Sequence, residues 1–236
     1  MKKSHIATLI VFFVLIPLTL IVGSRLSGRA FYVTSTLVIV ELLIPFFLAF
    51  EGRRPQAREL VVLAVMCALA VAGRVAIPIP SFKAIFGIIM IAGIAFGPES
   101  GFLVGAISAL ASNFFYSQGP YTPWQMMAYG AGGMLAGFVC AEGRLPRKPV
   151  VMGIFGFLAV AFFVGPLLDT CSVFLVMSRI SLKGAMAFYI SGFPVNLRQA
   201  VATAIVLLVL GKPLLEKLDR IKTKYGILDD EGRKEA

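Results

Sequence analysis

Charged residues are scarce in this sequence. Only 14% of the 236 residues are charged, whereas 58% are hydrophobic and the mean hydropathy is +0.90. A soluble domain of this length carries far more charge on its surface. The scarcity excludes an ordinary soluble protein, and the apolar stretches are long enough to cross about 30 Å of hydrocarbon. We therefore predict an integral membrane protein.

Residues that carry catalysis and metal binding are also rare. His5 is the single histidine, and the GxxxxGK[ST] loop that holds nucleotide phosphates does not occur in the sequence. The three cysteines lie within apolar segments and lack metal-ligand spacing: Cys67, Cys140 and Cys171. These absences exclude ATP hydrolysis by the chain itself and weigh against histidine-dependent catalysis. We expect neither an enzyme nor a metal or cofactor site.

Eight hydrophobic segments are separated by short connectors. They are Ile6–Gly23, Ala30–Phe50, Leu60–Pro78, Ala84–Gly97, Gly101–Tyr116, Trp124–Ala141, Val150–Met177 and Ala187–Gly211. Backbone N–H and C=O groups inside a bilayer have no water to bond, so each segment is expected to form a helix. The sequence predicts an all-α integral membrane protein with about eight transmembrane helices.

The positive charge, a net +10, gathers in connectors and in the C-terminal tail. Cations occupy the connectors 51–59 and 142–149 and the chain after Gly211, whereas the loop Ser117–Pro123 has none. Cytoplasmic loops of membrane proteins carry such an excess of Lys and Arg. We therefore predict cytoplasmic N- and C-termini in a multi-pass protein of the bacterial plasma membrane. The sequence has no basic folded domain of the kind that binds nucleic acid.

Small residues recur at every fourth position in three places. These rows are Ala64, Ala68 and Ala72; Gly97, Gly101, Gly105 and Ala109; and Gly133 and Gly137. The spacing aligns small side chains on one helix face and lets another helix approach closely. Packing within the bundle accounts for most of these residues. The alanine row is also a candidate docking face for a partner protein.

The most informative stretch is the uncharged region 112–126, which combines amides, hydroxyls, aromatic rings and prolines. An aromatic belt at the membrane interface explains Tyr121 and Trp124. It does not explain Asn113, Gln118 and Gln125 in the same place, because apolar walls with a few hydrogen-bonding groups are typical of a small-molecule site. We predict a substrate site at the outer ends of the helices, formed by Arg74, Lys83, Asn113, Gln118, Trp124, Gln125 and Tyr129.

Two further residues are candidates for this site. Asn196 and Arg198 follow Pro194 in the last hydrophobic segment, and they either complete the wall of the site or pair with Asp169. Asp169 and Glu41 are carboxylates within apolar segments, where a lipid-facing position is costly. A functional role for these two carboxylates is left open.

Three stretches resemble a known family. They are Arg74 with Pro80 and Lys83, then Phe96–Phe102, then Ser112–Phe115 through Gly119-Pro120 to Thr122–Met126. At these residues the sequence resembles the substrate-binding S-components of energy-coupling factor (ECF) vitamin transporters, and most closely the cobalamin type. The resemblance covers Arg58–Pro213.

The resemblance implies a fold and an assembly. It implies a six-helix core in residues 58–213, two additional transmembrane helices in residues 1–57 and a basic cytoplasmic tail in residues 214–236. It also implies a vitamin pocket closed by outer loops. Docking to a membrane coupling protein, driven by two ATPase subunits, is implied through the small residues Ala64, Ala68 and Ala72. Family members usually lack the two N-terminal helices and have more glycine and tryptophan in the loop at 116–121.

These observations predict the substrate-binding membrane subunit of an ECF-type ABC importer. Cobalamin is the first candidate substrate, and another vitamin or a nucleobase-like compound is the next. One alternative is a membrane enzyme acting on lipid or isoprenoid substrates, whose phosphates the basic inner loops and Arg198 would meet. Such an enzyme needs an acidic metal-binding pair or a nucleophile with a base, and we find neither. A noncatalytic membrane scaffold is the other alternative.

Overall fold

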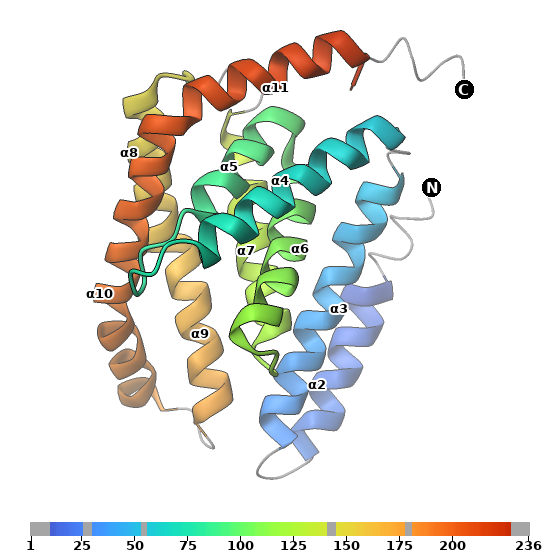
Figure 1. Ribbon diagram of the computed structural model, residues 1–236. Coiled ribbons are helices and arrows are strands. Elements are labelled where there is room, and N and C mark those ends of the chain that lie inside the picture. The colour runs from blue at the N-terminus through green and yellow to red at the C-terminus, as the bar shows by residue number, and fades with distance from the viewer. Residues whose placement is uncertain (1–9, 26–29, 53–55, 141–144, 178–180, 228–236) are drawn as a thin grey trace.

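The computed structural model describes residues 10–25, 30–52, 56–140, 145–177 and 181–227, and every regular element in those ranges is helical (Figure 1). In chain order they are η1 (Val11–Leu15), α2 (Ile16–Arg25), α3 (Ala30–Gly52), α4 (Ala57–Val75), α5 (Ile85–Phe96), α6 (Pro98–Tyr116), α7 (Thr122–Cys140), α8 (Pro149–Ala159), η3 (Val160–Val164), α9 (Gly165–Val176), α10 (Leu182–Val206), η4 (Leu207–Gly211) and α11 (Lys212–Tyr225). The elements marked η are short π-helical stretches. The predicted start of the first segment at Ile6 and the end of the basic tail lie outside the described residues.

Helices occupy the hydrophobic segments predicted from the sequence. Two helical stretches, Pro149–Val176 and Leu182–Tyr225, are long and apolar enough to cross a membrane by length and composition. By contrast, α5 has only 12 residues, which is about 18 Å at 1.5 Å per residue, and all of them are buried. This helix therefore belongs to the core and is too short to span a bilayer alone. The count of eight membrane crossings stays a prediction.

Each π-helical stretch ends two residues before a proline, namely Pro17, Pro166 and Pro213. Proline has no N–H, and its ring clashes with the carbonyl of the preceding turn, so the α-helical pattern of bonds is interrupted there. A wider π turn accommodates the interruption. After Pro213 the chain changes direction, and α11 lies across the end of the bundle while α10 runs along it (Figure 1).

Glycines let α5, α6 and α7 pack backbone against backbone. A Cβ added to Gly93 would lie 2.1 Å from the carbonyl oxygen of Gly133, and one added to Gly101 would lie 2.4 Å from the same atom. At Gly105 the nearest atom would be the carbonyl oxygen of Tyr129, at 2.4 Å. No side chain fits at these distances, so the four-residue glycine spacing marks internal packing, as predicted.

The N-terminal helices pack on the side of the bundle formed by α6 and α7. The rings of Phe47 in α3 and Phe102 in α6 meet edge to face, with centroids 6.4 Å apart. About two turns away along α3, Ile39 packs with Trp124 of α7. These contacts bury apolar surface of α3 against the core.

One face of α4 is exposed and apolar. Val61 is 64% exposed and Val65 is 52% exposed. The alanine row lies on the exposed part of the same helix: Ala64, Ala68 and Ala72. The described part of α3 therefore leaves this row uncovered.

Polar contacts fix α11 to the end of the bundle. Lys222 donates from Nζ to the carbonyl oxygen of Ala95, in the last turn of α5, at 2.7 Å. Arg147, just before α8, donates to Asp219 at 2.8 Å. The last carbonyl groups of a helix lack partners within the helix, so Lys222 supplies one from outside.

Candidate ligand-binding site

Polar side chains from three helices meet toward the end of the bundle away from α11. Arg74 lies in the last turn of α4, and Ser112 and Asn113 lie near the end of α6. Thr122 and Gln125 lie in the first turn of α7, three residues apart and therefore on one face of that helix. We call these residues, together with Gln118, Tyr116 and Tyr129, the Arg74 cluster.

A tight turn places the start of α7 beside the end of α6. The N–H of Thr122 donates to the carbonyl oxygen of Gly119 at 2.9 Å, with Pro120 at the turn position that suits its fixed φ. The hydroxyl of Tyr121 donates to the carbonyl oxygen of Ser117 at 2.7 Å. Ser117 has a φ of 78°, and such backbone strain in a residue other than glycine concentrates at functional sites.

Arg74 sets the direction of the hydrogen bonds in the cluster. Because a guanidinium group only donates, Asn113 Oδ1 must be the acceptor of the 2.9 Å bond between them. The amide nitrogen of Asn113 then donates to Gln125 Oε1 at 2.8 Å and to Thr122 Oγ1 at 3.0 Å. The hydroxyl of Thr122 donates in turn to Gln118 Oε1 at 2.9 Å. Asn113 is 0% exposed and uses both of its donors, so in this state it orders its neighbours.

Aromatic rings surround the guanidinium group of Arg74. Its central carbon lies 4.9 Å from the ring centroid of Tyr116 and 5.5 Å from that of Tyr129. The Tyr116 hydroxyl also donates to the carbonyl oxygen of Arg74 at 3.0 Å. Phe86 packs against Tyr129 with ring centroids 4.5 Å apart. The rings attract the cation through their quadrupoles and offer flat apolar faces beside it.

Gln199 fastens the α4–α5 loop to α10. Its side-chain amide donates to the carbonyl oxygen of Lys83 at 2.7 Å and accepts from the Lys83 N–H at 3.3 Å. The Lys83 ammonium donates to the carbonyl oxygen of Ile77 in the same loop and lies 5.9 Å from the ring centroid of Tyr116. The loop thus brings a second cation to the Arg74 cluster.

Trp124 lies apart from the rest of the predicted site. The other α7 candidates, Gln125 and Tyr129, face the Arg74 cluster, whereas the Trp124 ring packs against Phe174 of α9 with centroids 5.4 Å apart. Its indole N–H is buried and has no hydrogen-bond partner among the described residues. In this structure Trp124 therefore belongs to the packing between α3, α7 and α9.

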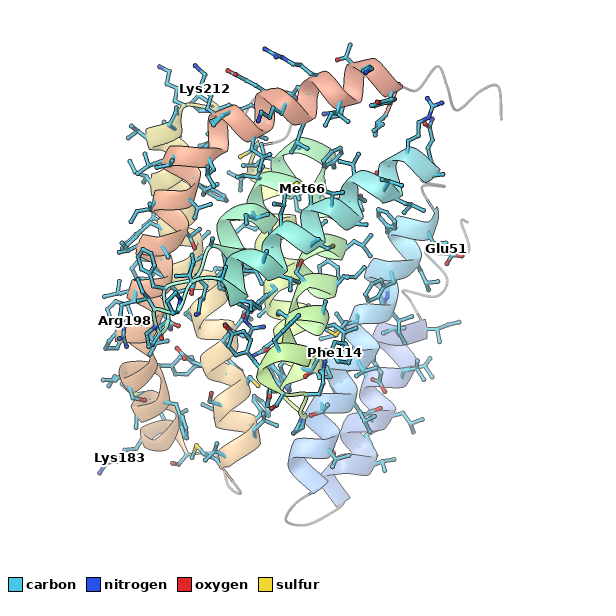
Figure 2. All side chains as sticks on the ribbon, viewed as in Figure 1. Glu51, Met66, Phe114, Lys183, Arg198 and Lys212 are labelled. Carbon is cyan, nitrogen blue, oxygen red and sulfur yellow. The ribbon has the colours of Figure 1, made fainter. Side chains whose placement is uncertain are left out.

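Asn196 and Arg198 have different surroundings. Asn196 donates to Asp169 Oδ2 at 2.7 Å and links α10 to α9. Arg198 is exposed, and its Nε donates to the carbonyl oxygen of Pro194 in its own helix at 3.4 Å. Figure 2 shows Arg198 at the outer edge of α10, well separated in the view from Phe114 at the end of α6. These two residues were predicted either to complete the wall of the site or to pair with Asp169. Asn196 pairs with Asp169, and Arg198 does not.

Four residues of this region were not among the predicted site residues: Ser112, Tyr116, Thr122 and Gln199. Helical spacing carried a signal for the first three, because Ser112 and Tyr116 are four residues apart and Thr122 is three residues before Gln125. Gln199 had no such signal, since its partner Lys83 is 116 residues away. Within the described ranges, no three His, Cys, Asp or Glu side chains gather in a way that would hold a metal ion.

A protein-family model described as ECF-type riboflavin transporter, S component, matches residues 55–216. The matched stretch is more than half of the chain and includes every residue of the Arg74 cluster. Neither a curated protein nor a solved structure matches the chain. S-components bind small vitamin substrates and work with a membrane coupling protein and ATPases. The chain therefore belongs to the ECF-type riboflavin transporter S-component family, and it is a substrate-binding membrane subunit of a transporter, not an enzyme.

Proposed function

We propose that this subunit captures its vitamin at the Arg74 cluster, from the outer face of the membrane. The observation that supports this placement most is the chain of hydrogen bonds from Arg74 through Asn113 to Gln125, beside the rings of Tyr116 and Tyr129. A small-molecule site needs apolar walls and a few polar groups held in fixed positions. The cluster combines both features where three helix ends meet.

Riboflavin is the first candidate substrate, because the matching family model is of the riboflavin type. Cobalamin, which the resemblance to the cobalamin-type S-components implies, is the second candidate. Both compounds present a broad ring system, which suits the aromatic faces of Tyr116 and Tyr129. Direct binding measurements with the two compounds separate these candidates.

Binding of both vitamins to the purified chain tests the site. Asn113→Ala and Gln125→Ala each remove an amide from the hydrogen-bond chain and should weaken binding about tenfold or more, because an unpaired buried polar group costs about 1–3 kcal/mol. Lys183→Met removes an exposed cation at the start of α10, far from Phe114 in Figure 2, and should bind like the wild type. Thermal unfolding shows which variants stay folded. Unchanged affinity in both folded amide variants would place the site elsewhere.

The exposed alanine row of α4 is the proposed docking face for the coupling protein. Ala68→Phe should abolish uptake in cells that contain the coupling protein and its two ATPase subunits, because the larger side chain keeps the partner helix away. Binding of vitamin to the purified variant should stay within about twofold of wild type, since the Ala68 side chain is exposed and lies six residues before Arg74 on α4. Ala187→Phe makes the same change at an exposed alanine of α10 and should leave uptake intact. Equal loss of binding and uptake in Ala68→Phe would mean that the row serves internal packing.

A further inference from the structure

Arg74 has only neutral partners. Its Nη1 donates to Ser112 and Asn113, while its Nη2 and Nε make no hydrogen bond to any residue that the structure describes. No carboxylate within the described ranges forms an ion pair with it. The Nη2–Nε edge of a guanidinium group is one that receives both oxygens of a carboxylate or phosphate. That edge of Arg74 is unused.

Lys83 adds a second positive charge that lacks a carboxylate partner in the described part of the chain. Its Nζ lies 5.9 Å from the centroid of Tyr116, and the Arg74 guanidinium carbon lies 4.9 Å from the same point. Two like charges beside one ring repel each other, and the repulsion is stronger where water is scarce. Cations among membrane helices are costly and usually face a partner or a water-filled cavity. An anion bound beside both cations would remove the repulsion.

The direction of the hydrogen bonds also favours an anionic ligand. Because Arg74 makes Asn113 Oδ1 an acceptor, the Asn113 amide must donate to Gln125 Oε1. Gln125 Nε2 is then left as a donor, without a partner among the residues described. The groups that remain for a ligand are therefore donors: the free edge of Arg74, the ammonium of Lys83 and Nε2 of Gln125. A complementary ligand presents acceptor atoms and negative charge.

We propose that the Arg74 cluster binds its ligand through an oxyanion, a phosphate or carboxylate group held by Arg74 and Lys83, with Gln125 as a neutral donor. The proposal rests on the proposed function, because it names the chemical class of ligand for the same site. It also separates related compounds, since a phosphorylated vitamin satisfies these donors and its uncharged parent does not. A lipid headgroup carries the same phosphate chemistry, so the experiment must identify the source of the oxyanion.

Two pairs of compounds that differ by a single phosphate test this proposal: riboflavin with riboflavin 5′-phosphate, and dicyanocobinamide with its phosphate. Affinities are measured calorimetrically with the purified full chain in a maltoside detergent, which contains no phosphate. In a pair that binds, the phosphorylated member should bind about tenfold more tightly or better, because charge-assisted hydrogen bonds are stronger than neutral ones.

Variants show whether the two cations cause that preference. Lys83→Met should reduce the preference for the phosphorylated member about tenfold, while affinity for the neutral member changes much less. Arg74→Lys keeps the charge but loses the planar fork, and it should reduce the preference as well. Lys183→Met removes an exposed cation outside the cluster and should leave the preference intact. Equal reduction in Lys183→Met would show a general effect of charge, which overturns the assignment to the cluster.

The possible results separate this proposal from the proposed function. If the neutral member of a pair binds as tightly as its phosphorylated partner, the oxyanion proposal fails and the site stands. If no member of either pair binds, both fail. A repeat in nanodiscs that contain phosphatidylglycerol then identifies the source. If the phosphorylated member still binds more tightly in these nanodiscs, the oxyanion belongs to the soluble ligand. If this preference disappears, the oxyanion is assigned to a lipid headgroup, and its assignment to the substrate is overturned.

Discussion

Two regions of the molecule use positive charge differently. At the α11 end, Asp219 accepts from Arg147 at 2.8 Å and lies 3.7 Å from Lys222. At the end of α4 and in the α4–α5 loop, Arg74 and Lys83 contact hydroxyl, amide and carbonyl oxygens and aromatic rings, all of them neutral. Cations that are already paired with carboxylates hold elements of the fold together. Arg74 and Lys83 have no carboxylate partner in the described part of the chain, and we propose that this leaves them available to a ligand.

Among the substitutions that test this comparison, charge reversal at Arg74 should have the largest effect on substrate affinity. Arg74→Glu replaces a group that only donates with one that only accepts, and it then faces the oxygens of Ser112 and Asn113. We expect substrate affinity to fall about a hundredfold, which corresponds to about 2.7 kcal/mol. Equilibrium binding of the candidate vitamins measures the effect.

The matched control is Asp219→Lys, a charge reversal at the α11 end. It removes the partner of Arg147 and Lys222 but touches no residue of the Arg74 cluster. Substrate affinity should stay within about twofold of wild type. Similar losses in the two variants would mean that charge reversal damages the whole bundle, and the contrast between the two regions would disappear.

A smaller effect is expected when the contact between Gln199 and the loop that carries Lys83 is removed. Gln199→Leu removes both hydrogen bonds between the Gln199 amide and the Lys83 backbone, so the α4–α5 loop is held less firmly. Bound vitamin should dissociate about five times faster or more, because the two bonds together contribute about 1–3 kcal/mol. Stopped-flow measurement of dissociation tests this. Ser191→Ala, whose hydroxyl bonds only within α10, should leave the rate unchanged. A rate for Gln199→Leu equal to that of wild type would show that the loop is held by other contacts.

The smallest effect is expected at the α11 end. Asp219→Ala removes two ion-pair contacts whose side chains are partly exposed, with 42% exposure for Asp219 and 45% for Arg147. Solvent screens such pairs, so the free energy of unfolding should fall by about 1 kcal/mol or less, and vitamin affinity should not change. Thermal unfolding with and without vitamin measures both. A marked loss of affinity would contradict the purely structural role of charge at this end.

Local sequence patterns predicted much of the fold and the proximity of some residues in the candidate site. The apolar runs located the helices because the bilayer requires internal backbone bonding, and the four-residue glycine spacing predicted helix faces that pack closely, as Gly101 does in the structure. The short turn between α6 and α7 made it possible to predict that Asn113 and Gln125 lie close together. These features depend on residues near each other in the chain.

Two other features of the candidate site were not predicted from local patterns of this kind. One depends on tertiary packing, and the other depends on helical spacing that the prediction left aside. Arg74 and Asn113 are 39 residues apart, and no local pattern fixes their hydrogen bond. The position of Trp124 was available from helix geometry, because an adjacent residue points about 100° away from Gln125 around a helix with 3.6 residues per turn. Aromatic character suggested a ligand contact, whereas position on the helix decides which neighbours the ring meets.

A single helical stretch holds α5 at both of its ends. Gln199 of α10 binds Lys83, two residues before α5 begins, and Lys222 of α11 binds Ala95 in its last turn. The stretch Leu182–Tyr225 is continuous, so α5 cannot slide along its axis without breaking one of these bonds. In mechanical terms the stretch acts as a brace. A force applied to α11 is passed along it to the loop that carries Lys83, so the stiffness of the proposed site depends on a helix that contributes no residue to the Arg74 cluster.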